Sequence, residues 1–206
     1  VKAVVYPISK EADERGKARI NWVAERPVPM DLPPQKEDWN RAGSLDDFID
    51  YFEDWRFNWL DVPRLFRETE TIYEFPMIDR DPVPQWSFGR VTLLGDAAHA
   101  MRPNGSNGSS QGIWDSEVIA AQLAEHDDVT QALKAYEDIR LKPVSQLVLE
   151  NRKTGPERVM QMAEDACDGT CTDVCTHVPR ETLEEVAASY KKLAGFDRAT
   201  IKIQEK

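Results

Sequence analysis

The sequence of 206 residues is poor in cysteine and has no long apolar run. Its three cysteines, an odd number, do not make the disulfide framework of a small secreted domain. No stretch of about 18 consecutive apolar residues occurs, so we expect no membrane-spanning helix. From Val1 onward the chain also lacks the architecture of a signal peptide. These absences predict a protein of the reducing cytoplasm.

Positive charge is scarce as well. The chain carries 26 Lys and Arg residues against 37 Asp and Glu residues, which gives a formal net charge of −11. Proteins that bind phosphate backbones need clustered Lys and Arg, so we expect no nucleic-acid partner. Hydrophobic residues make up 41% of the chain, which is enough for a core, and the length fits one large domain or parts of two.

The glycine fingerprint G-x-G-x-x-G is absent from the chain. In dinucleotide-binding folds this motif follows the first strand and holds the pyrophosphate at the start of a helix. The sequence therefore predicts no pyrophosphate cradle of that kind within these residues.

The stretch from Arg90 to Leu123 is the most informative one that is present. Residues 91–94 are apolar or β-branched and predict a fully buried strand, which Gly95 closes. Asp96 follows at the strand end. Ligands of open α/β sheets bind at the carboxyl ends of strands, so this carboxylate is placed to accept hydrogen bonds from a ribose or ribityl chain.

A glycine-rich loop and a helix follow this strand. Gly105 and Gly108 allow the backbone to approach a flat ligand closely. Ser109 and Ser110 can cap the predicted helix over residues 113–123, leaving first-turn N–H groups to face an anion or a carbonyl edge. The pattern indicates a binding loop for a planar, polar ligand.

Residues 95–115, GDAAHAMRPNGSNGSSQGIWD, closely resemble the second flavin-binding motif of the single-component FAD-dependent aromatic hydroxylases. These are the group A flavoprotein monooxygenases, the p-hydroxybenzoate hydroxylase family. The preceding YEFPMIDRDPVPQW and the order of segments are most similar to the branch that contains the pyocyanin-forming phenazine hydroxylase. The resemblance extends, with gaps, from about Val4 to about Tyr190.

The resemblance implies a set of FAD-binding residues. Asp96 would bind the ribityl chain, and Pro103 would lie beside the flavin ring near the site of oxygen activation, the one catalytic position we assign. The loop glycines would pass along the isoalloxazine, and the two serines would present backbone N–H groups to the flavin N1 and C2 carbonyl edge. Ser110 stands where many relatives have Asn. The predicted cofactor-binding residues are Gly95, Asp96, Pro103, Gly105, Gly108, Ser109 and Ser110.

The resemblance also implies a fold. We expect an α/β (α+β) fragment: part of a mixed-sheet substrate domain over residues 1–88, the returning portion of a Rossmann-like FAD-binding domain over 89–126, and a C-terminal helical segment over 127–206. Because the glycine fingerprint is missing, the chain resembles the C-terminal half of such an enzyme. We therefore expect weak FAD binding or none by these residues without the N-terminal half.

The function that follows from the resemblance is an FAD-dependent, NAD(P)H-using monooxygenase. Such an enzyme would hydroxylate an aromatic or N-heteroaromatic, phenazine-like acid with O2 through a flavin C4a-hydroperoxide, and a homodimer is an assembly left open for it. Two other classes stay open: another oxidoreductase of the FAD superfamily, such as a reductase or halogenase, and a non-enzymatic binding module.

A substrate pocket is predicted near the end of an expected strand over residues 71–78. By resemblance this strand borders the pocket, which makes Met77, Pro84 and Trp86 candidates for its lining. The alternative is a rigid, proline-rich crossover with a packed indole.

Apolar spacing and turn residues predict further elements. These are strands Ala3–Ile8 and Arg19–Ala24 joined as a hairpin, an amphipathic helix Ser44–Trp59 capped by Ser44, a helical region Val129–Ala166 broken near Pro143 and again near Gly155, a helix Glu181–Lys192, and a frayed tail after Phe196.

Three further features invite a functional interpretation. His99 is a candidate general base, but we expect a hydrogen-bonded structural histidine. Asp115 is expected to stabilise the positive start of its helix rather than to act in catalysis. The pattern of Cys167, Cys171, Cys175 and His177 has ligands for zinc or an iron–sulfur cluster. It lacks Cys-x-x-Cys pairs, so we predict no metal and leave open whether these residues bind anything.

Overall fold

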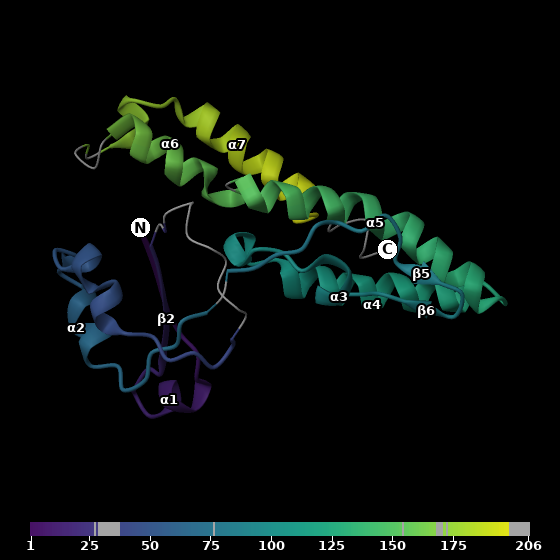
Figure 1. Cartoon of the computed structure of the whole chain (residues 1–206). Helices are drawn as coiled ribbons and strands as arrows, with labels where there is room; N and C mark the ends of the chain where they lie inside the picture. The colour runs from purple at the N-terminus through teal and green to yellow at the C-terminus, as the bar shows by residue number, and fades with distance from the viewer. Residues whose placement is uncertain are drawn as a thin grey trace. The chain divides into compact units, whose positions relative to one another are not determined.

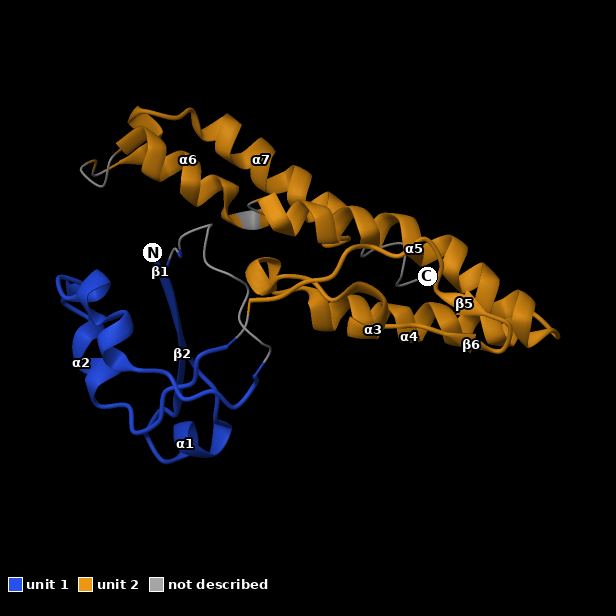
Figure 2. Cartoon of the chain, in the orientation of Figure 1, with its two compact units in different colours: residues 1–76 blue, residues 77–206 orange. Residues whose placement is uncertain are grey.

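The computed structural model describes residues 1–26, 28, 38–75, 77–153, 155–167, 171 and 173–197. The chain divides into two compact units, residues 1–76 and residues 77–206 (Figure 2). Helices and short strands occur together (Figure 1), which confirms the predicted mixed α/β class.

Unit 1 begins with the predicted hairpin. Strand β1 (Lys2–Pro7) pairs antiparallel with β2 (Ile20–Glu25), with Val4 opposite Val23. A short helix, α1 (Lys10–Glu14), occupies the connection. The predicted strands, Ala3–Ile8 and Arg19–Ala24, differ from the observed ones by one residue at each end. The location of the hairpin is therefore confirmed.

The predicted helix Ser44–Trp59 is wrong. The segment instead forms two 3₁₀ turns, η1 (Leu45–Asp47) and η2 (Ile49–Phe52), and then enters a small hairpin. Ser44 makes no side-chain cap bond, and Phe48 separates the turns with φ −145°, outside the helical region. The apolar spacing is therefore satisfied by packing of tight turns rather than by one helix.

The small hairpin and the helix after it complete unit 1. Strand β3 (Arg56–Phe57) pairs with β4 (Leu60–Asp61), and α2 (Val62–Arg67) follows at once. The Asp61 side chain accepts a hydrogen bond from the Arg64 N–H at 2.9 Å, and a proline lies in the first turn. This acid-then-proline start is a strong helix signal that our sequence interpretation missed.

Aromatic side chains form the core of unit 1. Ile49, Phe52, Val62 and Phe66 are buried, and the Trp22 ring of β2 lies 4.4 Å from the Phe66 ring, centroid to centroid. This cluster joins the first hairpin to the turns and to α2.

The strand predicted over residues 71–78 is not formed. Tyr73 makes one isolated bridge to Ala42, and Pro76 lies outside the described residues. Tyr73 and Phe75 are exposed, so no sheet face has formed over them.

Unit 2 contains a hairpin and a set of helices. Its elements are β5 (Ser87–Phe88), β6 (Val91–Thr92), α3 (Asp96–His99), η3 (Pro103–Gly105), α4 (Gly108–Glu125), α5 (Val129–Lys153), η4 (Gly155–Glu157), α6 (Arg158–Cys167), η5 (Val174–Thr176) and α7 (Arg180–Leu193). Helices α4 and α5 pack side by side, as do α6 and α7 (Figure 1). The predicted helices 113–123 and 181–192 are confirmed, each with a longer span.

The expected fully buried strand over residues 91–94 is wrong. Only Val91 and Thr92 are in strand conformation, Val91 is 63% exposed and Leu94 is exposed. Within the part of the chain that the structure describes, β6 pairs with β5 alone. A strand with a single neighbour and no layer over it cannot be buried on both faces.

The break expected at Pro143 is absent, whereas the break near Gly155 is confirmed. Helix α5 runs through Pro143, although this proline lacks an N–H and removes one helical hydrogen bond. The buried side chains of Val144 and Leu147 follow it and hold the helix against its neighbours. At Gly155 the backbone takes φ +51°, which favours glycine and ends the helix.

The core of unit 2 combines apolar and charged groups. Trp86, Ala98, Tyr136 and Val144 form a buried cluster. Beside it, the buried carboxylate of Glu137 accepts backbone N–H groups of Trp86 at 2.7 Å and of Ser87 at 2.5 Å. Burial alone would raise the pKa of Glu137, but hydrogen bonds from Lys134 and these N–H groups outweigh it and lower the pKa.

The described residues include no helix with both the length and the apolar character that crossing a bilayer requires. Most of the tail after Phe196 lies outside the described residues, so the expected fraying stays a prediction.

We predict that Phe66→Ala lowers the free energy of unfolding of unit 1 by about 3–5 kcal/mol, because it empties the centre of the aromatic cluster. The matched control is Phe75→Ala, which removes the same atoms from a ring that is 63% exposed and should cost under about 1 kcal/mol. Urea unfolding of the full chain, followed by tryptophan fluorescence, measures both. Equal losses for the two variants would contradict the assigned core.

Candidate functional site

The strand-end turn of unit 2 presents a free carboxylate. Gly95 takes φ +57°, which lets the chain turn sharply out of the hairpin region into α3. Asp96 is the first residue of α3 and is exposed. Among the described residues its carboxylate has no hydrogen-bond partner, so it is available to a ligand's hydroxyl groups.

A buried ionic network lies directly behind this turn. Asp115 of α4 is fully buried, and its Oδ2 accepts from the Gly95 N–H at 2.9 Å and lies 2.6 Å from Nε2 of His99. Its Oδ1 accepts from Nε of Arg140 at 2.8 Å. Nη2 of Arg140 also donates to Oε1 of Gln111 at 2.7 Å. One carboxylate thus joins the turn, α3, α4 and α5.

The network keeps Asp115 ionised. Burial alone would raise the pKa of Asp115, but hydrogen bonds from His99, Gly95 and Arg140 outweigh it and lower the pKa. Because an ionised carboxylate can only accept, His99 donates through Nε2. His99 is therefore the expected hydrogen-bonded structural histidine. The helix-start role expected of Asp115 is wrong, since its bonds go to the turn, α3 and α5.

The start of α4 has backbone donors without acceptors. Asn107 is the N-cap residue, but its side chain makes no cap bond and its Nδ2 donates instead to Oη of Tyr190 at 2.8 Å. In the described part of the chain, the N–H groups of Gly108, Ser109 and Ser110 therefore meet no acceptor. An 18-residue helix carries roughly half a positive charge at this end.

Helix α7 holds the loop in front of α4. The Tyr190 hydroxyl donates a hydrogen bond to Oδ1 of Asn151 at 2.8 Å and accepts one from Nδ2 of Asn107. Gly105 lies against this hydroxyl so closely that a Cβ would overlap it. Burial raises the pKa of Tyr190, so the phenol remains protonated and can donate. The glycine at 105 thus serves loop packing.

These features fit a flat cofactor with a polyol chain. Unpaired donors at the start of α4 suit a carbonyl or anionic edge, and the exposed carboxylate of Asp96 suits hydroxyl groups. At Gly95, a Cβ would meet nothing within 4 Å, so the turn leaves open space. The turn and the start of α4 thus offer both hydrogen-bond donors and an acceptor to a ligand.

The remaining predicted residues lie apart from this network. Pro103 begins η3 and is exposed, as are Met77 and Pro84. Trp86 is 1% exposed and its ring packs 5.9 Å from that of Tyr136, which agrees with the alternative of a packed indole. The pocket roles of Met77 and Pro84 stay predictions.

Several residues of the site escaped the sequence interpretation. Glu137, Arg140 and Asn151 are all buried on one side of α5. Their signal was available: charged and amide side chains occur at helical spacing within the apolar stripe that contains Val144 and Leu147. Asn107 and Tyr190 carried no such signal, because their partners lie far along the chain.

Comparisons with known proteins show what the chain is similar to. Residues 61–151 match the family described as FAD binding domain. Phenazine 1,6-dicarboxylic acid hydroxylase PhzS of Lysobacter antibioticus is 45% identical over 152 residues, covering 73% of this chain and 37% of that protein. The chain is therefore similar to FAD-dependent aromatic hydroxylases, and the similarity includes a segment that matches an FAD-binding family. The predicted resemblance is confirmed, and FAD is the cofactor of this family.

Two further proteins show the same similarity. The 3-amino-4-hydroxybenzoate 2-monooxygenase PtnB3 of Streptomyces platensis is 42% identical over 98 residues, covering 47% of this chain and 25% of that protein. A salicylate hydroxylase structure with bound substrate aligns with 93% of this chain and 46% of its own, at 24% identity and a TM-score of 0.58, which supports the fold. The chain spans between a quarter and two-fifths of the curated hydroxylases named here.

We predict that Asp115→Asn lowers the free energy of unfolding by about 3–5 kcal/mol at pH 7, because Arg140 loses its buried partner. The folded pKa of Asp115 is lowered, so its contribution is present above the unfolded pKa of about 4 and is lost as the pH falls below that value. Denaturant unfolding from pH 7 to pH 2 should show the two proteins converge at low pH. In the exposed control Asp138→Asn, the loss should stay below about 1 kcal/mol. A constant gap for Asp115→Asn would contradict an ionised carboxylate.

We predict that Gly105→Ala destabilises the chain by about 1–3 kcal/mol, because the new methyl group overlaps the Tyr190 hydroxyl. The matched control is Gly108→Ala, whose Cβ would meet only Cγ of Met101 at 3.8 Å and should change stability by about 0.5 kcal/mol or less. In a Tyr190→Phe background the Gly105→Ala cost should shrink, since the overlapping oxygen is gone. Thermal unfolding of the four variants tests the contact, and an undiminished cost in that background would refute it.

Proposed function

We propose that the protein carrying this chain is an FAD-dependent, NAD(P)H-using monooxygenase that hydroxylates an aromatic or N-heteroaromatic acid of phenazine-carboxylate type. One observation carries the proposal: a long helix begins with three unpartnered backbone N–H groups next to a turn that bears a free carboxylate. This arrangement lies inside the segment, residues 61–151, that matches the FAD-binding family.

Each predicted residue has a role in this proposal. Asp96 would accept hydrogen bonds from the ribityl hydroxyls. The N–H groups of Gly108, Ser109 and Ser110 would donate to the flavin N1 and C2 carbonyl edge, where the helix end favours negative charge on the reduced ring. Pro103 would lie beside the ring. Gly95 would provide the turn, and Gly105 would let the loop pass close to the ring while packing on Tyr190.

When bound, FAD reduced by NAD(P)H would supply the oxygen-transfer chemistry of such enzymes, through a C4a-hydroperoxide. The chain's own contribution would be positioning and shielding. The α4 N–H groups would orient the ring edge, and the loop before α4, held by Asn107, would exclude water from it. No side chain of this segment is required as an acid or base.

The substrate class rests on the relatives. PhzS is named for a phenazine dicarboxylic acid and PtnB3 for an aminohydroxybenzoate, and both substrates are aromatic acids. We propose an aromatic acid here too, with O2 as co-substrate and with Met77 and Pro84 near it. Residues 1–88 would belong to the substrate domain, 89–126 to the FAD domain and 127–206 to a helical segment.

The rest of the FAD site would come from residues outside this sequence. G-x-G-x-x-G is absent, so the pyrophosphate would be held by an N-terminal half that carries it. We propose a cytoplasmic enzyme, with a homodimer as the expected assembly.

The proposal is tested with the natural gene product that carries this sequence. We expect bound FAD, NAD(P)H oxidation stimulated by phenazine-1,6-dicarboxylic acid, and a product heavier by one oxygen atom that derives from ¹⁸O₂. Oxidation without oxygen incorporation would support a reductase instead, and halide incorporation would support a halogenase. A gene product without flavin would favour a binding module.

We predict that Asp96→Ala in this gene product weakens FAD binding about 10-fold or more, because a charge-assisted hydrogen bond to the ribityl chain contributes about 1.5–3 kcal/mol. Asp46→Ala is the control, since Asp46 is also an exposed acid in the first turn of its helix. Fluorescence titration of the apoprotein with FAD measures both affinities. Equal affinities in the two variants would remove Asp96 from the site.

A further inference from the structure

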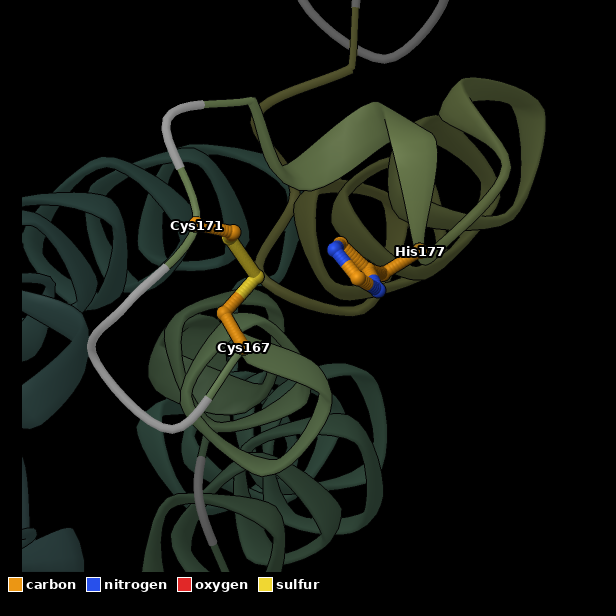
Figure 3. A group of neighbouring side chains, drawn as sticks. All are labelled: Cys167, Cys171 and His177. Carbon is orange, nitrogen blue, oxygen red and sulfur yellow. A yellow bond between two sulfur atoms is a disulfide. The ribbon is translucent and has the colours of Figure 1, made fainter.

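A group of sulfur and nitrogen side chains lies at the connection between α6 and α7, away from the loop described above. Cys167 is the last residue of α6, and a disulfide joins it to Cys171, with the two Cα atoms 5.2 Å apart. The ligand atoms of Cys167, Cys171 and His177 all lie within 4.8 Å of one another. Figure 3 shows the imidazole of His177 turned toward the disulfide.

The local backbone explains why His177 reaches back to the cysteines. The Asp173 side chain caps η5 by accepting from the Cys175 N–H at 2.9 Å. The N–H groups of His177 and Val178 both donate to the Val174 carbonyl at 2.9 Å. These bonds turn the chain so that the residue after η5 faces the end of α6.

We propose that Cys167, Cys171 and His177 form a zinc site when the disulfide is reduced. Two thiolates and one imidazole are the ligands that zinc prefers, and three protein ligands plus one water complete a tetrahedron. Zinc–sulfur bonds of about 2.3 Å place two thiolates about 3.8 Å apart, which the present spacing of the two Cα atoms can accommodate. The site is accessible to an ion because Cys171 is half-buried and His177 is exposed, while Cys167 is buried.

Reduction of the disulfide requires a dithiol reductant and does not involve the metal. A dithiol reductant gives two electrons and two protons to the Cys167–Cys171 bond, which breaks into two thiols while the reductant closes into a cyclic disulfide. Zinc then binds the two thiolates, and the two thiol protons pass to solvent. Disulfide and metal are therefore mutually exclusive occupants of one site.

Cys175 provides an internal control. It is a free, exposed cysteine four residues after Cys171, but its sulfur does not belong to the group of three. A site made by this geometry depends on His177 and is indifferent to Cys175. Non-specific metal capture by thiols would instead depend on Cys175 and not on His177.

The test titrates the full 206-residue chain with Co²⁺, a spectroscopic substitute for zinc, after reduction by a dithiol and removal of the reductant. We expect one Co²⁺ per chain, with the intense visible bands of tetrahedral coordination and thiolate charge-transfer bands, all displaced by one equivalent of Zn²⁺. The oxidised chain should bind none. Weak octahedral bands, or equal binding by oxidised and reduced chain, would overturn the proposal.

Variants assign the ligands. Cys171→Ser and His177→Ala should each weaken Co²⁺ binding at least about 10-fold, because losing a direct ligand costs no less than losing an outer-shell partner, whereas Cys175→Ser should leave binding within about twofold. Circular dichroism verifies that each variant is folded, and the buried Cys167 is left intact. As a second readout, Zn²⁺ should slow alkylation of Cys171 and leave alkylation of Cys175 unchanged, as mass spectrometry of the labelled peptides shows. Loss of binding in Cys175→Ser with retention in His177→Ala would refute this ligand set.

Discussion

The buried carboxylate of Asp115 is the constraint on which the site depends. A carboxylate in a protein interior is costly unless donors surround it, and here the turn, α3 and α5 each supply one. All three elements must be in place together for the charge to be satisfied. Because the Gly95 N–H is one of the donors, the network also fixes the residue after it, and the exposed position of Asp96 follows from the buried network behind the turn.

The side chain of Asn107 determines the hydrogen bonding at the start of α4. Its contact with Tyr190 leaves backbone N–H groups of the first helical turn without acceptors. A helix N-cap such as Asn107 would ordinarily satisfy an N–H of its own first turn. Tyr190 of α7 takes up its amide instead, so the start of α4 remains uncapped. Helix α7 lies beyond the matched segment 61–151, so residues outside that segment shape the chemistry presented inside it.

The sequence predicted best what short-range chemistry decides. Glycine followed by an acid marked the turn at Gly95. The helix after the glycine-rich loop was also predicted, but the capping role of Ser109 and Ser110 is wrong, because α4 begins at Gly108 and both serines lie within its first turn. Sequence interpretation failed where distant packing decides: the aromatic spacing of residues 44–59 suited a helix, yet Phe48 leaves the helical region so that two turns can pack on Phe66. Arg140 could not be paired with Asp115 in advance, since 25 residues separate them.

The charged residues buried on α5 have a structural consequence for the site. Glu137 and Arg140 each find fixed partners, so a shift of α5 along its neighbours would leave two buried charges unpaired at a cost of several kcal/mol. Apolar side chains such as Val144 and Leu147 tolerate small shifts far better. The charges therefore specify the register of α5 against its partners, and through Arg140 and Asp115 that register helps to position the turn before α3.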